Sequence, residues 1–167
     1  MAYVIAIDVG VKNLGLCVFD MLTAKVIKWD NVSLVPGGRY TPALNVQYVL
    51  QFIGRNKEVF DNASAVIVER QMRCNMRIIE AVFQTLYYDR CKIINPRCVK
   101  AHYKISMRNY RANKVAAVEW TKEFVRNNPN AFANGSLQSF NCRKQDDLAD
   151  ALLLCLYYLD TYSTQLE

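Results

Sequence analysis

The chain is short of zinc ligands. It has a single histidine, His102, and its six cysteines include no Cys-x-x-Cys pair, which disfavours the usual zinc sites. Cys17 and Cys155 lie inside apolar segments, where cysteine packs as a small hydrophobic residue. We therefore expect reduced structural thiols, as in an intracellular protein. The six cysteines are Cys17, Cys74, Cys91, Cys98, Cys142 and Cys155.

Long apolar runs are also missing. No apolar stretch reaches the roughly 18 residues needed to cross a membrane. The first residues read as a strand and not as a basic or Arg/Ser-rich targeting segment. We expect a soluble intracellular protein of the cytoplasm, or of cytoplasmic viral factories if the source is viral. There is no internal repeat or linker, so the 167 residues are expected to form one domain, 1–167.

Acidic residues are absent between Arg90 and Val118, a segment that holds eight basic residues. The formal net charge of the whole chain is +6, so the remainder is slightly acidic. A basic segment on a near-neutral body is typical of a protein that binds a polyanion. Tyr103 and Tyr110 lie among these charges, and aromatic rings can pack on sugars or bases. A solvated basic face is the alternative interpretation.

Apolar periodicity predicts a three-stranded meander followed by alternating helices and strands. Strands are expected at residues 3–8, 16–19, 25–29, 65–68 and 92–95, and helices at about 41–60, 75–87, 112–125 and 146–158. Pro36 to Gly38 break the pattern after the meander. Ile78 widens the apolar stripe of the 75–87 helix. We expect this stripe to pack against the core alone, although a stripe of this width could also pack against the core and a partner subunit together. The order of elements predicts a mixed sheet with packed helices, of α/β or α+β class.

Three acidic positions stand at the boundaries of predicted elements. Asp8 lies in an apolar strand, Glu69 ends another, and Asp146, Asp147 and Asp150 open the last helix. A buried carboxylate needs a cation nearby. Asp147 and Asp150 are spaced i,i+3, and Asp146 and Asp150 are spaced i,i+4, so either pair would lie on one face of the helix. Because oxygen ligands suit Mg²⁺ or Mn²⁺, the pattern predicts a divalent metal site for phosphoryl transfer, in which two ions could act.

Each acid also has an ordinary structural explanation. Asp8 could cap the turn that follows it, Asp146 could be the N-cap of the last helix, and Glu69 could form an ion pair with Arg70. The occurrence of all three in matching elements favours the metal site.

Three segments resemble the acidic motifs of RuvC-like Holliday junction resolvases: Ile7–Gly15, Val68–Gln71 and Lys144–Ala151. The resemblance is strongest to the poxvirus-type and fungal mitochondrial branch, whose first motif reads Asp-x-Gly-x-Lys-Asn. It spans nearly the whole chain and implies an α/β domain with a ribonuclease H-like fold, in which helices cover both faces of a mixed five-stranded sheet. It further implies a homodimer that resolves four-way DNA junctions by paired symmetric nicks, as a Mg²⁺-dependent endonuclease.

The resemblance also implies roles for individual residues. The catalytic residues would be Asp8, Glu69, Asp147, Asp150 and Lys114. These four acids, with Asp146 as the alternative to Asp147, would hold two Mg²⁺ ions, for which Mn²⁺ could substitute, and no small-molecule cofactor is implied. The DNA-binding residues would be Lys12, Gln71, Arg73, Arg97, Lys100, Lys104, Arg108 and Arg111.

Other functions remain compatible with the same acids. A YqgF-like nuclease of this fold would act on structured RNA, and a non-catalytic module would bind junctions without cutting them. Lys12, Asn13 and the acidic cluster at 146–150 favour the junction enzymes. Intact acids disfavour the module, because a mere binder gains from losing negative charge near phosphates. A sugar kinase or actin-like ATPase would need a second domain, for which this chain is too short.

Overall fold

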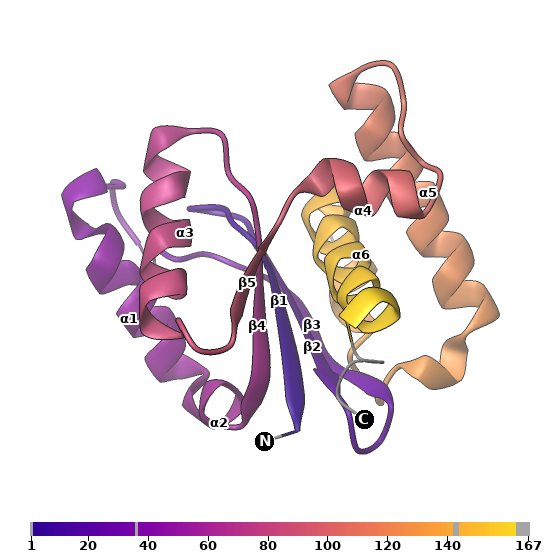
Figure 1. Ribbon diagram of the computed structural model, residues 1–167, viewed down its shortest axis with the longest axis horizontal. Coiled ribbons are helices and arrows are strands. Elements are labelled where there is room, and N and C mark those ends of the chain that lie inside the picture. The colour runs from indigo at the N-terminus through magenta and orange to yellow at the C-terminus, as the bar shows by residue number, and fades with distance from the viewer. Residues whose placement is uncertain (1, 36, 142–143, 163–167) are drawn as a thin grey trace.

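A mixed five-stranded sheet forms the centre of the computed structural model, which describes residues 2–35, 37–141 and 144–162 (Figure 1). The strands are β1 (Tyr3–Asp8), β2 (Leu14–Asp20), β3 (Lys25–Val32), β4 (Ala63–Glu69) and β5 (Cys91–Ile94). Their spatial order is β3-β2-β1-β4-β5. β1 to β3 form the antiparallel meander, and β4 and β5 run parallel to β1. The prediction of a mixed five-stranded sheet is therefore confirmed.

Helices cover both faces of this sheet, as predicted (Figure 1). The helical elements are η1 (Pro42–Leu44), α1 (Asn45–Arg55), α2 (Lys57–Asp61), α3 (Cys74–Leu86), α4 (Pro96–His102), α5 (Tyr110–Asn127), η2 (Pro129–Ala131), η3 (Gln138–Asn141) and α6 (Gln145–Tyr162). On one face Phe52 of α1 and Phe83 of α3 pack with Ile5 and Ile7 of β1. On the other face α6 lies across the sheet, with α5 outside it.

Two α-helical segments differ from the prediction. The helix expected at 41–60 is interrupted at Asn56, whose side chain donates a hydrogen bond to the Phe52 carbonyl at 2.8 Å and so competes with the helical ladder. Helix α4 was not predicted at all, although Asn95 and Pro96 gave a signal for it. The Asn95 side chain accepts the N–H of Arg97 at 2.9 Å, and proline is favoured in the first helical position.

The cysteine prediction is confirmed only in part. All five described cysteines are free, and Cys17 and Cys155 are buried between sheet and helix as expected. Cys74 and Cys98 are exposed, so the prediction of structural thiols is wrong for these two. Cys142 and the predicted break at Pro36 lie outside the described residues.

The wide apolar stripe of α3 divides between core and surface. Ile79 and Phe83 are fully buried, whereas Ile78 is 45% exposed. Within the described residues, no helix combines the length and the apolar character of a membrane span.

Candidate metal centre

Asp8, Glu69 and Asp150 meet at one edge of the sheet. β1 and β4 are adjacent and parallel, so Asp8 and Glu69, their last residues, end side by side. Helix α6 packs across β1 and β2 and brings Asp150 to the same place. One carboxylate oxygen from each of the three lies within 4.8 Å of the others. Oxygens that share a Mg²⁺ ion at about 2.1 Å stand at most about 4.2 Å apart, so this spacing is close to that of a ligand set.

The turn after β1 brings the chain close to itself beside Asp8. A Cβ atom at Gly10 would lie 2.0 Å from the carbonyl oxygen of Asn13, so only glycine leaves room for this turn. Lys12 and Asn13 of this turn both line a cleft that lies over the acids.

The acids repel one another and are poorly hydrated. Burial raises the pKa of Asp8 well above its usual value, and the charges of Glu69, Asp150 and Asp147 add to this. Burial, followed by the charge of Asp150, raises the pKa of Glu69 to about 7, against the opposing effect of two lysines. Negative charge is therefore only partly compensated by the surrounding side chains. A set of oxygen donors with excess negative charge fits a hard divalent cation.

The two acids in the first turn of α6 have different surroundings. Asp146 forms an ion pair with Lys114 of α5, and this ammonium group lowers the pKa of Asp146 although burial acts to raise it. Asp147 lines the cleft beside Asp8 and accepts a hydrogen bond from Asn31 Nδ2 at 3.4 Å. Burial and then the charge of Asp146 raise the pKa of Asp147. The geometry therefore sets Asp147, and not Asp146, beside the three-acid cluster.

Two of the structural alternatives for these acids are wrong. Helix α6 begins at Gln145, so Asp146 lies inside its first turn and is not the N-cap. Within the described residues Glu69 forms no ion pair with Arg70, which is exposed.

Two lysines approach the acids from separate helices. Lys100 of α4 binds Asp150, with 3.0 Å between Nζ and Oδ1, and both side chains are largely buried. Burial acts to lower the pKa of Lys100, but Asp150 raises it overall. Lys114 stands in the second turn of α5, whose start is set by Asn109, because the Asn109 side chain accepts the N–H of Ala112 at 2.9 Å. Both lysines are thus held at fixed positions beside the carboxylates.

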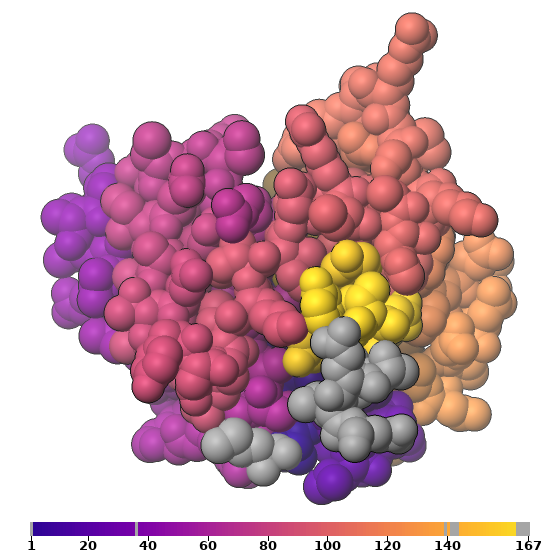
Figure 2. Space-filling view, in the orientation of Figure 1, coloured from indigo at the N-terminus to yellow at the C-terminus, as the bar shows by residue number. Residues whose placement is uncertain are grey.

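A cleft of about 640 Å³ lies over the carboxylates. Ten of the fourteen residues predicted for the site line it: Asp8, Lys12, Glu69, Gln71, Arg73, Arg97, Lys100, Lys114, Asp147 and Asp150. Asp146 lies outside the lining because it faces Lys114. Lys104, Arg108 and Arg111 are exposed in the loop after α4 and at the start of α5. This part of the molecule projects from its body (Figures 1 and 2).

The cleft is also lined by residues that the sequence pattern did not indicate. Met72 is 88% exposed and Tyr110 is 75% exposed, and both belong to its lining. Lys144 lines it as well, and its place in the third acidic motif was a usable signal. An exposed methionine has no sequence signature, because its residue type is typical of a core position.

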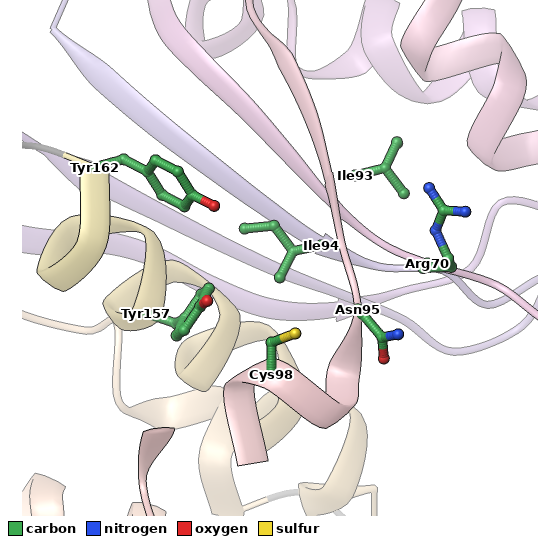
Figure 3. Close-up of a pocket in the computed structure, with 7 residues that line it drawn as sticks. All are labelled: Arg70, Ile93, Ile94, Asn95, Cys98, Tyr157 and Tyr162. Carbon is green, nitrogen blue, oxygen red and sulfur yellow. The ribbon is translucent and has the colours of Figure 1, made fainter. Parts of the chain in front are cut away.

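A second cavity, of about 340 Å³, also has Arg70 in its lining (Figure 3). It is formed between β5, α4 and α6, with Ile94, Cys98 and Tyr157 on one side of the strand and Arg70 on the other. It has no carboxylate in its lining and is separate from the metal centre, although Arg70 contributes to both.

Residues 2–161 match the family described as Poxvirus A22 protein. No match was found among curated proteins. Similar solved structures include the following three. The yeast mitochondrial Holliday junction resolvase Ydc2 is 19% identical, with 98% of this chain and 86% of that chain covered and a TM-score of 0.70. The Fowlpox virus resolvase, solved with substrate Holliday junction DNA, is 16% identical, with 99% of both chains covered and a TM-score of 0.68.

The third is Thermus thermophilus RuvC in complex with a Holliday junction substrate, which is 19% identical, with 98% of both chains covered and a TM-score of 0.54. At these identities the likeness is one of fold, and the predicted fold is confirmed.

Proposed function

The chain belongs to the poxvirus A22 protein family, and we propose that it is an endonuclease that resolves four-way DNA junctions by paired symmetric nicks. The observation that carries this proposal is the meeting of Asp8, Glu69 and Asp150 within 4.8 Å in a cleft bordered by lysine and arginine. Structures of similar fold from Fowlpox virus and Thermus thermophilus hold Holliday junction DNA, which supports this substrate.

Asp8, Glu69, Asp147 and Asp150 are the proposed metal ligands, for two Mg²⁺ ions that Mn²⁺ can replace. When bound, these ions would activate water and offset the charge of the leaving oxygen. Asp147 is preferred to Asp146 because it lines the cleft, whereas Asp146 is engaged by Lys114. By holding the two metal ions, the acids would determine where the attacked phosphate binds.

Lys114 is the proposed catalytic cation. Burial acts to lower its pKa, but hydrogen bonding to Asp146 raises the pKa above its ordinary value, so the side chain stays protonated at neutral pH. A permanently protonated ammonium group cannot serve as a general base. Its role would be to bind a phosphate oxygen and stabilise the charge that develops on it. Lys100, which faces Asp150, would share this work from α4.

DNA would be held by two groups of basic residues. Lys12, Arg73 and Arg97 line the cleft and would contact phosphates near the cut. A second group would contact an arm farther out, from the projecting part of the molecule: Lys104, Arg108 and Arg111. Such contacts release counterions, so binding should weaken steeply with salt. Gln71 lies in the cleft too, with its side-chain amide turned back to the Glu69 carbonyl at 3.1 Å.

A homodimer is proposed as the working unit, because two active sites related by a two-fold axis match a two-fold junction. The exposed part of the α3 stripe around Ile78 is available for a second copy of the chain. The enzyme would act where branched DNA forms, in the cytoplasm if the source is viral.

The deciding experiment offers the purified protein a labelled four-way junction, a linear duplex and a structured RNA, in Mg²⁺ or Mn²⁺. Symmetric nicks in the junction are the expected result. Tight junction binding without nicks in either metal would identify a binding module, and preferential cleavage of the RNA would identify a YqgF-like nuclease. Asp8→Asn should abolish nicking while the protein still binds the junction, which separates a role in chemistry from a role in folding.

A further inference from the structure

Glu80 in the middle of α3 is a buried acid outside the cluster described above. Glu80 is only 6% exposed to solvent, and its neighbours Ile79 and Phe83 pack in the core against the sheet. A buried carboxylate is costly unless it accepts strong hydrogen bonds. Its presence on the buried side of an otherwise apolar stripe therefore needs a specific partner.

That partner is the backbone of the turn that follows Glu69. Glu80 Oε2 accepts the N–H of Gln71 at 2.6 Å, a short, charge-assisted contact. The Gln71 side chain in turn donates to the Glu69 carbonyl at 3.1 Å. The N–H of Arg70 donates to the Ile94 carbonyl of β5 at 2.8 Å. The three residues from Glu69 to Gln71 are thus held by hydrogen bonds to α3, to β5 and between Gln71 and Glu69 within the segment.

We propose that Glu80 is a positioning residue for the metal centre: through the Gln71 N–H it holds the end of β4 so that the Glu69 carboxylate stays within ligand distance of Asp8 and Asp150. The proposal rests on the proposed function. Glu69 is the last residue of its strand, so its direction depends on the turn behind it. Loss of the acceptor would leave the Gln71 N–H without this partner and allow the turn to move. Partners that orient metal ligands are typically responsible for 10–100-fold in affinity or activity.

The test compares Glu80→Met with Glu80→Gln, which keeps a carbonyl oxygen as acceptor. Phe83→Leu is the control, because it weakens the packing of the same helix in the core and leaves the Glu80 carboxylate in place. Two readouts do not depend on DNA cleavage: Mn²⁺ affinity by calorimetry, and hydrogen exchange of the Gln71 amide by NMR. Glu80→Met should bind Mn²⁺ about 10–100-fold more weakly and exchange the Gln71 amide faster. Glu80→Gln should remain within about threefold of the wild type, and Phe83→Leu should leave the Mn²⁺ affinity unchanged.

Three outcomes would overturn the proposal. They are a folded Glu80→Met protein with wild-type Mn²⁺ affinity, a loss in Phe83→Leu equal to that in Glu80→Met, and a loss in Glu80→Gln as large as in Glu80→Met. If Glu80→Met does not fold, Glu80→Asp replaces it, because a side chain shorter by one methylene would not reach the Gln71 N–H. A wild-type protein that binds Mn²⁺ but cuts no junction would refute the proposed function and leave the role of Glu80 testable by the same two readouts.

Discussion

Gly15 of β2 lies against the backbone carbonyl of Asp147 in the first turn of α6, where a Cβ atom would stand 2.2 Å from that oxygen. Gly15 is needed for space and not for a left-handed conformation, since its φ lies outside that region. Trp29 of β3 secures the same turn, because its Nε1 donates to the Leu148 carbonyl at 2.8 Å. This close approach of helix to strand brings Asp147 and Asp150 to Asp8.

Gly15→Ala should therefore damage stability and cleavage together. The added methyl group must push α6 away from β2, which we expect to lower the free energy of unfolding by about 1–3 kcal/mol and to slow junction nicking. Urea unfolding and the nicking rate measure the two effects. Gly54→Ala is the matched control: Gly54 lies within α1 with no atom near its Cβ position, so alanine should stabilise the helix by about 0.5–1 kcal/mol and leave nicking unchanged. Equal behaviour of the two variants would contradict this account.

Asparagine substitutions should distinguish Asp146 from Asp147. Asp147→Asn removes a proposed metal ligand, and we expect a loss of more than about 100-fold in nicking rate, beyond the effect of an outer partner. Asp146→Asn leaves the cleft lining intact but weakens the hold on Lys114, so a loss of about 10-fold is expected. Single-turnover nicking over a range of Mg²⁺ concentrations measures both. A reversed order of the two losses would make Asp146 the ligand.

Asp8→Asn should remove activity and stabilise the metal-free protein. The asparagine keeps the shape of Asp8 but removes a buried charge that three other acids repel. The free energy of unfolding in the absence of metal should rise by about 1–3 kcal/mol, and junction affinity should be equal or higher. Thermal unfolding in EDTA and a gel-shift titration test these expectations. A large fall in stability would show that Asp8 serves the fold.

The stability of the metal-free protein should fall as the pH rises. The pKa of Glu69 is raised to about 7 from its ordinary 4.5, by burial first and by Asp150 next. Between these values the folded protein binds protons that the unfolded chain has released, so the free energy of unfolding decreases with pH, by about 1–3 kcal/mol. Asp8 acts in the same direction.

Urea unfolding between about pH 4.5 and 7, with EDTA or with Mg²⁺, measures this dependence. Bound Mg²⁺ should flatten it, because a cation offsets the charge that appears when the acids lose their protons. Glu69→Gln should flatten it in EDTA as well. A stability that rises through this range in EDTA, in the wild type but not in Glu69→Gln, would contradict the assignment.

Removal of a single arginine from the projecting segment should change the salt dependence of binding. Arg111→Ala should weaken junction binding and reduce the slope of log affinity against log salt by about 0.9, the value for one phosphate contact on duplex DNA. Lys57→Ala is the control, because Lys57 of α2 pairs with Asp61 far from the start of α5 (Figure 1). Fluorescence anisotropy at several salt concentrations gives both slopes. An unchanged slope in Arg111→Ala would remove Arg111 from the DNA contacts.

Much of the fold follows from local patterns in the sequence. The strands and most helices were predictable, because alternation and helical periodicity reflect which side chains are buried. Asp8 and Glu69 could be identified in the same way, since a charge at the end of an apolar strand breaks the pattern. The interruption at Asn56 and helix α4 were missed, because they depend on single side-chain to backbone hydrogen bonds.

The sequence by itself determined which acidic residues are candidate ligands and the strand or helix that carries each of them, because residue types and periodicity are local properties. Only the tertiary structure separated Asp147 from Asp146, since the distinction depends on Lys114, which arrives on another helix 32 residues away. It also revealed the contact between Glu80 and Gln71, in which a core position of α3 supports the end of β4. Both are side-chain contacts between separate elements, and their geometry is fixed by packing, which no linear pattern encodes.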